Sequence, residues 1–328
     1  MNHTDNKTGT EKVQPGADGE NRPRVRFFDV DENSHGQRLD NFLASRLKGV
    51  PKSLIYRYIR KDEIRINKKR CKQDTRLTAG DQVRVAPIRI STQQATAAPG
   101  AELQAALRSA IVYEDECLIA INKPAGLAVH AGTGSPRGLI ESLRHMGGEG
   151  SYRELVHRLD KETSGLMLIA KQAKALKKLQ DDFRARRVTK VYQALVHGHW
   201  PATLNRIDKP LSRRQPTEGE RIVVVDKAGK PAETAFRLLK LAGLNSLIEA
   251  RPKTGRTHQI RVHCQQAGHA IIGDSKYTPA GQSQAEGKEL FLHAASLQFT
   301  HPLSSEQMTL NAELRPSMSR FIQRYCRT

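Results

Sequence analysis

The chain has 328 residues, of which 38% are hydrophobic, so it can form one large domain plus a small one, or two medium domains. Lys and Arg number 54 against 34 Asp and Glu, a formal net charge of +20. This excess favours an anionic partner, nucleic acid first and an anionic membrane surface second, over a basic surface that is merely solvated.

Residues 1–24 are polar and carry almost no large apolar side chains, which predicts a disordered tail. The tail has no apolar core of a signal peptide, and no apolar run in the chain approaches the roughly 18 residues of a membrane span. The cysteines are scattered without zinc-ligand or redox spacing, which predicts thiols in a reducing cytosol and a cytoplasmic protein. They are Cys71, Cys117, Cys264 and Cys326.

Residues 25–90 are predicted to form a small basic domain. Between residues 36 and 90 there are 15 Lys or Arg and 5 Asp or Glu, a net charge of +10. The segment RLDNFLASRL has helical apolar spacing, and PKSLIYRYIRKDE repeats it after Pro51 at a helix start. IRINKKR and DQVRVAPI alternate apolar and basic residues, as half-buried strands do.

Residues 91–106 are small, polar and alanine-rich, which predicts a linker with a short helix at its end. Residues 107–328 are predicted to form one larger domain. In it, IVYED, CLIAINKP, LVHRLD, GLMLIAK, KVYQALVHG, NSLIEARP and LFLHAASLQFTHP read as strands, and KALKKLQDDFRAR and THQIRVHCQQAG read as helices. Strands outnumber helices without regular alternation, so we expect an α+β fold with a large, mixed or mostly antiparallel sheet.

The stretch HRLDKETSG places His157, Arg158 and Asp160 where a predicted strand ends in a loop, a common position for a catalytic group. A hydrolase triad of Asp160, His157 and Ser164 is disfavoured because Ser164 lacks the strand-turn-helix sequence of a nucleophile elbow. The simplest alternative is that Asp160 caps a turn.

Two further stretches carry candidate residues. TGRTHQIRVH contains Arg256 and Arg261, either of which could neutralise a carboxylate or a phosphate. Its histidines, His258 and His263, are five residues apart, which is not the spacing of a helical metal pair. Tyr192 on a predicted strand is suited either to core packing or to stacking on a nucleobase.

Five motifs in order resemble those of the RluA-type family of RNA pseudouridine synthases. HRLDKETSG is similar to the family signature, NKPAGLAVH to its Lys-Pro motif, KVYQALVHG to its tyrosine motif, TGRTHQIRVH to its arginine motif and LFLHAASLQFTHP to its late strand. The basic domain resembles an S4 RNA-binding domain. The resemblance implies an S4-type domain followed by a pseudouridine synthase domain, which converts specific uridines to pseudouridine in large-subunit (23S) ribosomal RNA.

The same resemblance implies roles for individual residues. Asp160 is then the catalytic aspartate, either attacking C1′ or removing the 2′ proton, with Tyr192 stacked on the target base and Arg261 paired with Asp160. Substrate-binding roles are implied for Arg158, which enters the RNA stack, and for His157, Ile260, Leu292 and Lys123. An isomerisation consumes no hydride, electron or group donor, so we expect no cofactor and no metal.

The S4-like domain is expected to contact RNA phosphates through its basic side chains. These are Lys52, Arg57, Arg60, Lys61, Lys68, Lys69 and Arg70. We expect ribosomal RNA as the partner of a monomer that requires no protein partner and no membrane. The alternatives are a family member acting on other rRNA or tRNA uridines, a non-catalytic RNA-binding protein, and a nuclease or hydrolase using Asp160 and His157.

Overall fold

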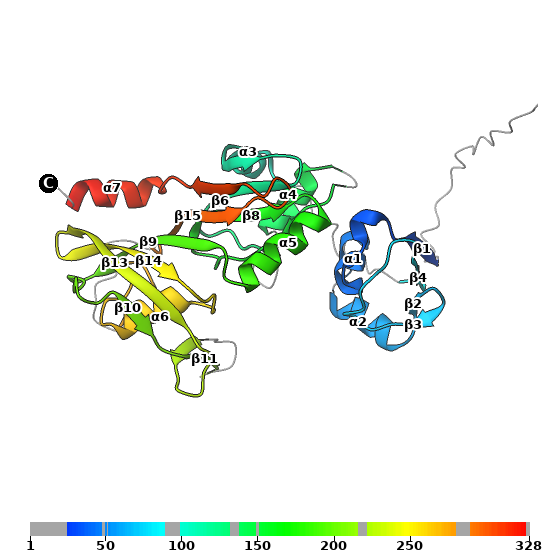
Figure 1. The fold of residues 1–328 in the computed structure, drawn as a ribbon, viewed down its shortest axis with the longest axis horizontal. Coiled ribbons are helices and arrows are strands. Elements are labelled where there is room, and N and C mark those ends of the chain that lie inside the picture. Colours follow the sequence, from blue (N-terminus) through cyan, green and yellow to red (C-terminus); the bar gives the residue numbers. More distant parts are fainter. Residues whose placement is uncertain are drawn as a thin grey trace, which may run out of the picture. The chain divides into compact units, whose positions relative to one another are not determined.

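The computed structural model describes residues 25–47, 50, 52–88, 99–131, 138–148, 151–215, 222–279 and 289–325. The chain forms two compact units, divided between residues 93 and 94 (Figure 1). The first unit contains the basic segment, and the second contains the five motifs. The predicted disordered tail, residues 1–24, lies outside the described residues, as do residues 91–98 of the predicted linker.

The first unit packs two helices against a small antiparallel sheet with the strand order β1-β4-β2-β3. Its elements are β1 (Arg26–Asp29), the 3-10 helix η1 (Glu32–Ser34), α1 (Leu39–Arg46), α2 (Lys52–Arg60), β2 (Ile64–Ile66), β3 (Lys69–Arg70) and β4 (Gln82–Val85). The apolar side of α1, including Phe42 and Leu43, meets Ile64 and Val83 of the sheet in one core. The helical spacing of these residues is thereby explained, since each turn delivers an apolar side chain to the same face.

The second unit is built on one large sheet with helices around it (Figure 1). Its strands are β5 (Ile111–Glu114), β6 (Leu118–Lys123), β7 (Glu154–Leu155), β8 (Ser164–Ala170), β9 (Thr189–His197), β10 (Arg206–Asp208), β11 (Leu211–Arg214), β12 (Ile222–Val225), β13 (Glu233–Ala242), β14 (Asn245–Pro252), β15 (Leu292–Thr300) and β16 (Gln307–Asn311). Its helices are α3 (Ala101–Ser109), α4 (Leu139–Met146), α5 (Ala173–Arg184), α6 (Gln259–Gln266) and α7 (Pro316–Tyr325).

The large sheet is mixed, as predicted. Its described strands follow the order β10-β13-β14-β9-β15-β8-β6-β5, with β16 beside β15 and β7 beside β8. Among these described strands, β15 and β8 run parallel and the other neighbours run antiparallel. β11 and β12 form a separate two-stranded ribbon. The fold is therefore α+β, with mostly antiparallel pairing.

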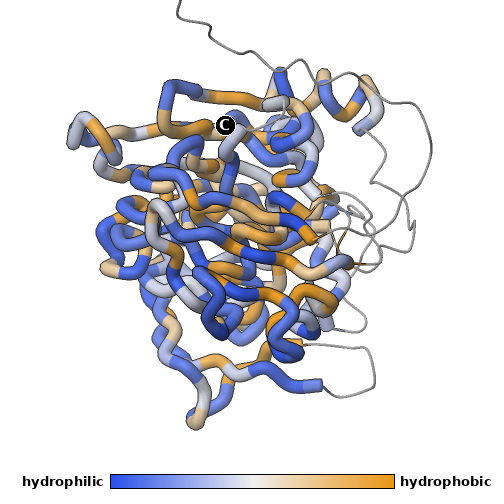
Figure 2. The backbone as a smooth tube through the Cα atoms, turned by 90° about the vertical axis from the view of Figure 1, so that its right-hand side faces the viewer, coloured by the Kyte–Doolittle hydropathy of each residue, from blue (hydrophilic) through white to orange (hydrophobic). Residues whose placement is uncertain are grey.

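Strand β8 lies in the interior, and all seven of its residues are buried. Leu166 and Leu168 face a cluster that includes Leu179 of α5, whereas Met167 and Ile169 face the cluster that holds α4. Figure 2 shows hydrophobic stretches along strands in the middle of the view. The uninterrupted apolar sequence of β8 follows from this burial on both faces.

Gly165 in β8 allows β15 to lie directly alongside. It pairs with Ala294 in the parallel register, and its φ is +111°. A Cβ at this position would lie 2.3 Å from the carbonyl oxygen of Ala294, a contact that no side chain can make. Beside it, the Ser164 hydroxyl and Nδ1 of His293 are 2.9 Å apart, which links the two strands again.

One predicted strand boundary is wrong. Of the expected strand LVHRLD only Leu155 is strand, in β7, because the next N–H of β8, that of Leu168, donates to the His157 side chain instead of to a strand backbone (3.1 Å). The predicted linker 91–106 ends inside α3, whose Leu107 is fully buried against α4. Within the described residues, no helix is both long and apolar enough to cross a membrane.

Candidate active site

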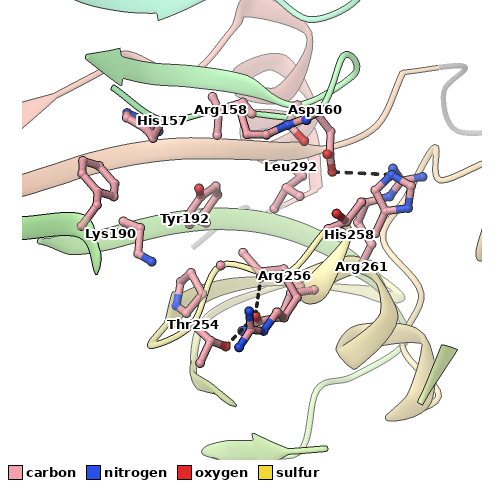
Figure 3. Close-up of a pocket in the computed structure, with 18 residues that line it drawn as sticks. His157, Arg158, Asp160, Lys190, Tyr192, Thr254, Arg256, His258, Arg261 and Leu292 are labelled. Atoms are coloured by element: carbon pink, nitrogen blue, oxygen red, sulfur yellow. Dashed lines mark hydrogen bonds and ion pairs between the residues drawn. The ribbon is translucent and has the colours of Figure 1, made fainter. Parts of the chain in front are cut away.

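A cavity of about 300 Å³ opens in the second unit, where three segments meet (Figure 3). One is the loop that leads into β8, the second is β9 with the start of β15, and the third is the loop between β14 and α6. The lining residues are His157, Arg158, Leu159, Asp160, Thr163, Phe183, Lys190, Tyr192, Pro252, Thr254, Gly255, Arg256, Thr257, His258, Gln259, Ile260, Arg261 and Leu292. Seven of the eight predicted catalytic and substrate-binding residues line this cavity, and the eighth, Lys123, does not.

Asp160 stands in the loop before β8 and is partly exposed, with 24% of its side chain accessible. Its backbone carbonyl accepts a hydrogen bond from the Thr163 N–H (3.2 Å), so the loop turns tightly before the strand begins. The side chain that approaches the Asp160 carboxylate is that of His258, whose Nε2 lies 3.8 Å from Oδ2 (Figure 3). The carboxylate is thus presented to the cavity from a braced turn.

The predicted ion pair between Arg261 and Asp160 is wrong. Arg261 on α6 donates two hydrogen bonds of 2.7 Å to Asp274, and both side chains are almost fully buried. Burial lowers the pKa of Arg261, but the hydrogen bonds and charge of Asp274 outweigh that effect and leave the pKa above its ordinary value. Asp160 adds a smaller attraction from farther away. The guanidinium therefore faces the site while Asp274 holds it in place.

Tyr192 lies on β9 between Lys190 and Leu292, with its ring at the cavity wall (Figure 3). The ring also contacts the apolar clusters on both sides, so packing fixes its position. Burial raises the pKa of its hydroxyl and the nearby Asp160 charge adds to the effect, so Tyr192 is neutral. Leu292 and Ile260, 4% and 6% exposed, supply apolar wall on either side.

His157 and Arg158 differ in how tightly their side chains are packed. The His157 ring stacks on Phe183 with centroids 4.6 Å apart, and its Nε2 accepts the Leu168 N–H. Burial, and then the charge of Lys190, lower the pKa of His157 to about 3, so the ring is neutral and braces the loop. Arg158 is exposed at the cavity and is free of such packing constraints.

Lys123 does not line the cavity, which corrects its predicted substrate-binding role. It is fully buried, and its ammonium group donates to the carbonyls of Pro124 (2.8 Å), Leu127 (3.0 Å) and Lys161 (3.0 Å). Burial lowers its pKa to about 8. The side chain ties the Lys-Pro motif to the loop just after Asp160, so it supports the candidate carboxylate from behind.

Sequence reasoning missed several lining residues, above all Lys190 and His258. Lys190 precedes Tyr192 by two positions on β9, and residues two apart share a face of a strand, so this signal was available. Burial, and then the charge of Arg186, lower its pKa. Within the described part of the chain, no hydrogen bond or ion pair involves the Lys190 ammonium group.

The loop between β14 and α6 is braced by Gln259. Its Oε1 accepts from the Thr254 hydroxyl (2.7 Å) and from the Arg256 N–H (3.0 Å). Its Nε2 donates to the Glu233 carbonyl (2.9 Å). One side chain of the TGRTHQIRVH motif thus fixes the loop that carries Arg256 and His258.

The predicted RNA contacts of the first unit lie on α2 and in the β2–β3 hairpin. Arg57, Arg60, Lys61, Lys68, Lys69 and Arg70 are exposed, and Nε of Arg70 is 3.3 Å from Asp62. The side chain of Lys52 lies outside the described residues. The exposed side chains leave their charges accessible to an anionic partner.

A metal-type donor cluster within the described residues, Asp115, Cys117 and His301, lies outside this cavity. Nδ1 of His301 accepts the Ser304 N–H (3.0 Å), so the ring proton is on Nε2, which donates to Asp115 (2.8 Å). The imidazole nitrogen that a metal would need already carries the proton. The donors fit a hydrogen-bonded link between β6 and the end of β15 better than a metal site.

The sequence matches two family models. The model described as RNA pseudouridylate synthase matches residues 117–266, and the S4 domain model matches residues 37–83. The chain is 44% identical over 311 residues to "Ribosomal large subunit pseudouridine synthase C" of Salmonella typhimurium, covering 92% of this chain and 97% of that protein. The chain belongs to the RNA pseudouridylate synthase family. Proteins of the same name in Escherichia coli K12 and Vibrio cholerae are 44% and 46% identical, over 92% and 89% of this chain and 97% and 94% of theirs.

Solved structures of the same family are similar in fold. "Human RNA Pseudouridylate Synthase Domain Containing 4" is 28% identical, with a TM-score of 0.57 over 68% of this chain and 95% of that one. "Human RNA Pseudouridylate Synthase Domain Containing 1" is 26% identical, with a TM-score of 0.55 over 65% and 86%. This protein is therefore an RNA pseudouridine synthase, an isomerase, with an S4 domain that indicates RNA binding.

Proposed function

We propose that this pseudouridine synthase isomerises specific uridines of large-subunit (23S) ribosomal RNA, with Asp160 as its catalytic aspartate. The observation that carries the proposal is that the Asp160 carboxylate and the Tyr192 ring line one cavity of about 300 Å³. That volume is at the lower end of small-molecule sites, which suits a single nucleoside. The names of the 44% identical relatives support the large ribosomal subunit as the target.

The isomerisation is balanced without a co-reactant. The N1–C1′ bond of uridine breaks, the uracil turns, and a C5–C1′ bond forms. The C5 proton leaves and N1 ends with a proton, so no net oxidation or reduction occurs. An ionised Asp160 serves either route, attack on C1′ or removal of the 2′ proton.

The target base has to leave its stack before C1′ can be reached, at a cost of a few kcal/mol. Stacking on Tyr192 offsets part of that cost, and Leu292 and Ile260 close the apolar wall around the base. Arg158, exposed beside the cavity, enters the gap left in the RNA, since its planar guanidinium can replace a base as a stacking neighbour. Lys190 and Arg256 supply positive charge for the phosphates next to the target.

The S4 domain supplies affinity, through phosphate contacts made by its exposed basic side chains. Ribosomal RNA is the partner, and the protein acts in the cytoplasm as a monomer without a protein partner. Target choice between rRNA and tRNA is the alternative that the experiment has to separate.

The test uses transcripts of large-subunit rRNA and a tRNA pool, each labelled with tritium at C5 of uracil. Tritium release reports the loss of the C5 hydrogen, and sequencing maps the modified positions. Asp160→Asn is expected to abolish release while RNA affinity stays within about twofold, with Asp208→Asn, an exposed aspartate on β10, as the matched control. Substantial release by Asp160→Asn refutes the catalytic assignment, and exclusive modification of tRNA refutes the rRNA target.

A further inference from the structure

His258 is the residue of the cavity whose side chain reaches the Asp160 carboxylate. Its Nε2 lies 3.8 Å from Oδ2 of Asp160, and the two side chains are 16% and 24% exposed. Arg261 is engaged by Asp274 through two hydrogen bonds. Within the described residues, no Lys or Arg side chain forms an ion pair with the Asp160 carboxylate.

The hydrogen bonds around His258 favour one tautomer. The N–H of Val223 donates to the Tyr277 hydroxyl oxygen (3.0 Å), which leaves the hydroxyl proton free to donate to Nδ1 of His258 (2.7 Å). Burial raises the pKa of Tyr277 and lowers that of His258, so the hydroxyl keeps its proton and the imidazole is neutral. A neutral ring that accepts at Nδ1 carries its proton on Nε2, the atom that faces Asp160.

The backbone of His258 is in an uncommon conformation that serves this orientation. Its φ is 53° and its ψ is 18°, the left-handed region that residues with a Cβ rarely adopt. His258 stands at the N-cap of α6, yet its side chain makes no capping hydrogen bond. Instead the ring meets the Tyr277 ring edge-on, with centroids 5.5 Å apart. Unusual backbone at a site of this kind indicates that the ring direction matters.

Both strands of the β11–β12 ribbon contribute hydrogen bonds that position Tyr277 and the segment before His258. The N–H of Val223, on β12, donates to the Tyr277 hydroxyl oxygen. Arg213, on β11, donates to the hydroxyl of Thr257 (2.7 Å), the residue before His258. Outside this ribbon, the Tyr277 N–H and the Asp274 carboxylate are 3.2 Å apart. The tyrosine is therefore anchored to the same aspartate that holds Arg261.

We propose that His258 is a positioning residue, which donates its Nε2–H to Asp160 and aims the carboxylate at the ribose, with Tyr277 setting its tautomer. The proposal rests on the proposed role of Asp160. The separation of 3.8 Å exceeds a hydrogen bond, and it shortens when RNA fills the cavity, as hydrogen bonds of catalytic groups commonly do on substrate binding.

The test compares His258→Leu with His258→Gln, since both side chains are unbranched at Cβ and bear the same backbone cost. Single-turnover tritium release at saturating RNA is measured together with RNA affinity. His258→Leu is expected to slow release about 10- to 100-fold, the usual loss when a group that orients a catalytic ligand is removed. His258→Gln, which retains an N–H donor at similar reach, recovers most of the rate, and RNA affinity is unchanged by either.

Two further variants separate positioning from folding. His258→Asn suits the left-handed backbone but is too short to reach Asp160, so it folds as the wild type does and is as slow as His258→Leu. Tyr277→Phe is expected to slow release roughly tenfold alone and to add almost nothing to His258→Leu, because both act through one group.

The two possible failures are distinguishable in the same assay. Release by Asp160→Asn at the wild-type rate overturns the proposed function. If Asp160→Asn is inactive but His258→Leu and His258→Asn are as fast as the wild type, the positioning role alone is overturned. The positioning role is also overturned if His258→Leu and His258→Gln slow tritium release equally, or if the effect of Tyr277→Phe adds fully to that of His258→Leu.

Discussion

The guanidinium of Arg261 is held by Asp274, through two hydrogen bonds of 2.7 Å, and Asp160 stands beyond this pair. An arginine near a catalytic carboxylate would ordinarily be expected to form the ion pair itself. Here the pair is internal to the scaffold, and the positive charge reaches Asp160 only at longer range. Arg261 therefore contributes to stability through its pair with Asp274, and its proposed effect on Asp160 acts only at longer range.

Arg261→Met is expected to destabilise the protein by about 3–5 kcal/mol, because it leaves the fully buried Asp274 carboxylate without its partner. Urea unfolding followed by circular dichroism measures the loss. Arg184→Met serves as the control, since Arg184 pairs with Asp181 at the surface, where such pairs contribute about 0–1 kcal/mol. Equal stability of the two variants would contradict the buried pair.

Gly165→Ala is expected to destabilise the second unit, because its Cβ would overlap the backbone of Ala294. The matched control is Gly268→Ala, which has a positive φ of 85° but nothing within 4 Å of the added carbon. The control should lose about 1–2 kcal/mol from its backbone conformation alone. Gly165→Ala should lose about 1–3 kcal/mol more from the steric overlap, together with its pseudouridine synthase activity. Similar melting temperatures for the two variants would rule out the close approach of β8 and β15.

Lys190→Met is expected to weaken RNA binding, because Lys190 lines the cavity and its ammonium group has no hydrogen bond or ion pair among the described residues. If it contacts one phosphate, the slope of log affinity against log salt falls by about 0.7. Lys240→Met, an exposed lysine of β13 outside the cavity, is the control. An unchanged slope for Lys190→Met would mean that the amine does not neutralise a phosphate.

Stability should fall in acid because His293 is buried as the neutral ring. Burial lowers the pKa of His293 to about 4 from its ordinary value of 6.5, so between these two pH values the unfolded chain binds a proton at this ring and the folded chain does not. The contribution is fully present above pH 6.5 and is lost as the pH falls towards 4, by about 3 kcal/mol for this group. His293→Gln should flatten that limb of the stability curve, whereas His199→Gln, at an exposed position, should leave it as in the wild type. Parallel curves for the His293 variant and the wild type would exclude the assignment.

Replacing Arg57, Arg60 and Lys61 together by Gln should weaken RNA binding with little effect on the rate at saturation. These exposed side chains border one end of α2, and three lost phosphate contacts should reduce the salt slope by about 2. Nitrocellulose filter binding over a series of salt concentrations gives the slope. A slope equal to that of the wild type would show that this end of the S4 domain does not touch RNA.

The spacing of apolar residues predicted helices and strands correctly where burial determines the structure. Helix α1 and strand β8 were predictable because an apolar stripe, or an uninterrupted apolar run, has few alternative ways to be buried. Short or basic elements gave no such signal: β10 and β11 carry arginine at exposed positions and form because neighbouring strands pair with them.

In the candidate site, too, some features were predictable from the sequence and others were not. Motif likeness directed attention to Asp160, Tyr192 and Leu292, which line one cavity. The partner of Arg261 was not predictable, because Asp274 lies in a loop without periodicity and only the folded chain brings the two together. Lys123 was misassigned for a related reason, since a lysine in a motif gives no sign of whether its amine points to solvent or to three buried carbonyls.

The parallel pairing of β8 with β15 also sets the order in which the protein matures during its own synthesis. Asp160 precedes β8, whereas Leu292 opens β15, near the end of the chain. A nascent chain that has already exposed Asp160 lacks the strand that forms the neighbouring wall, so the cavity cannot close until β15 has been synthesised. The S4 domain, which has its own core, emerges first. A growing chain is thus equipped to hold RNA well before it can modify it.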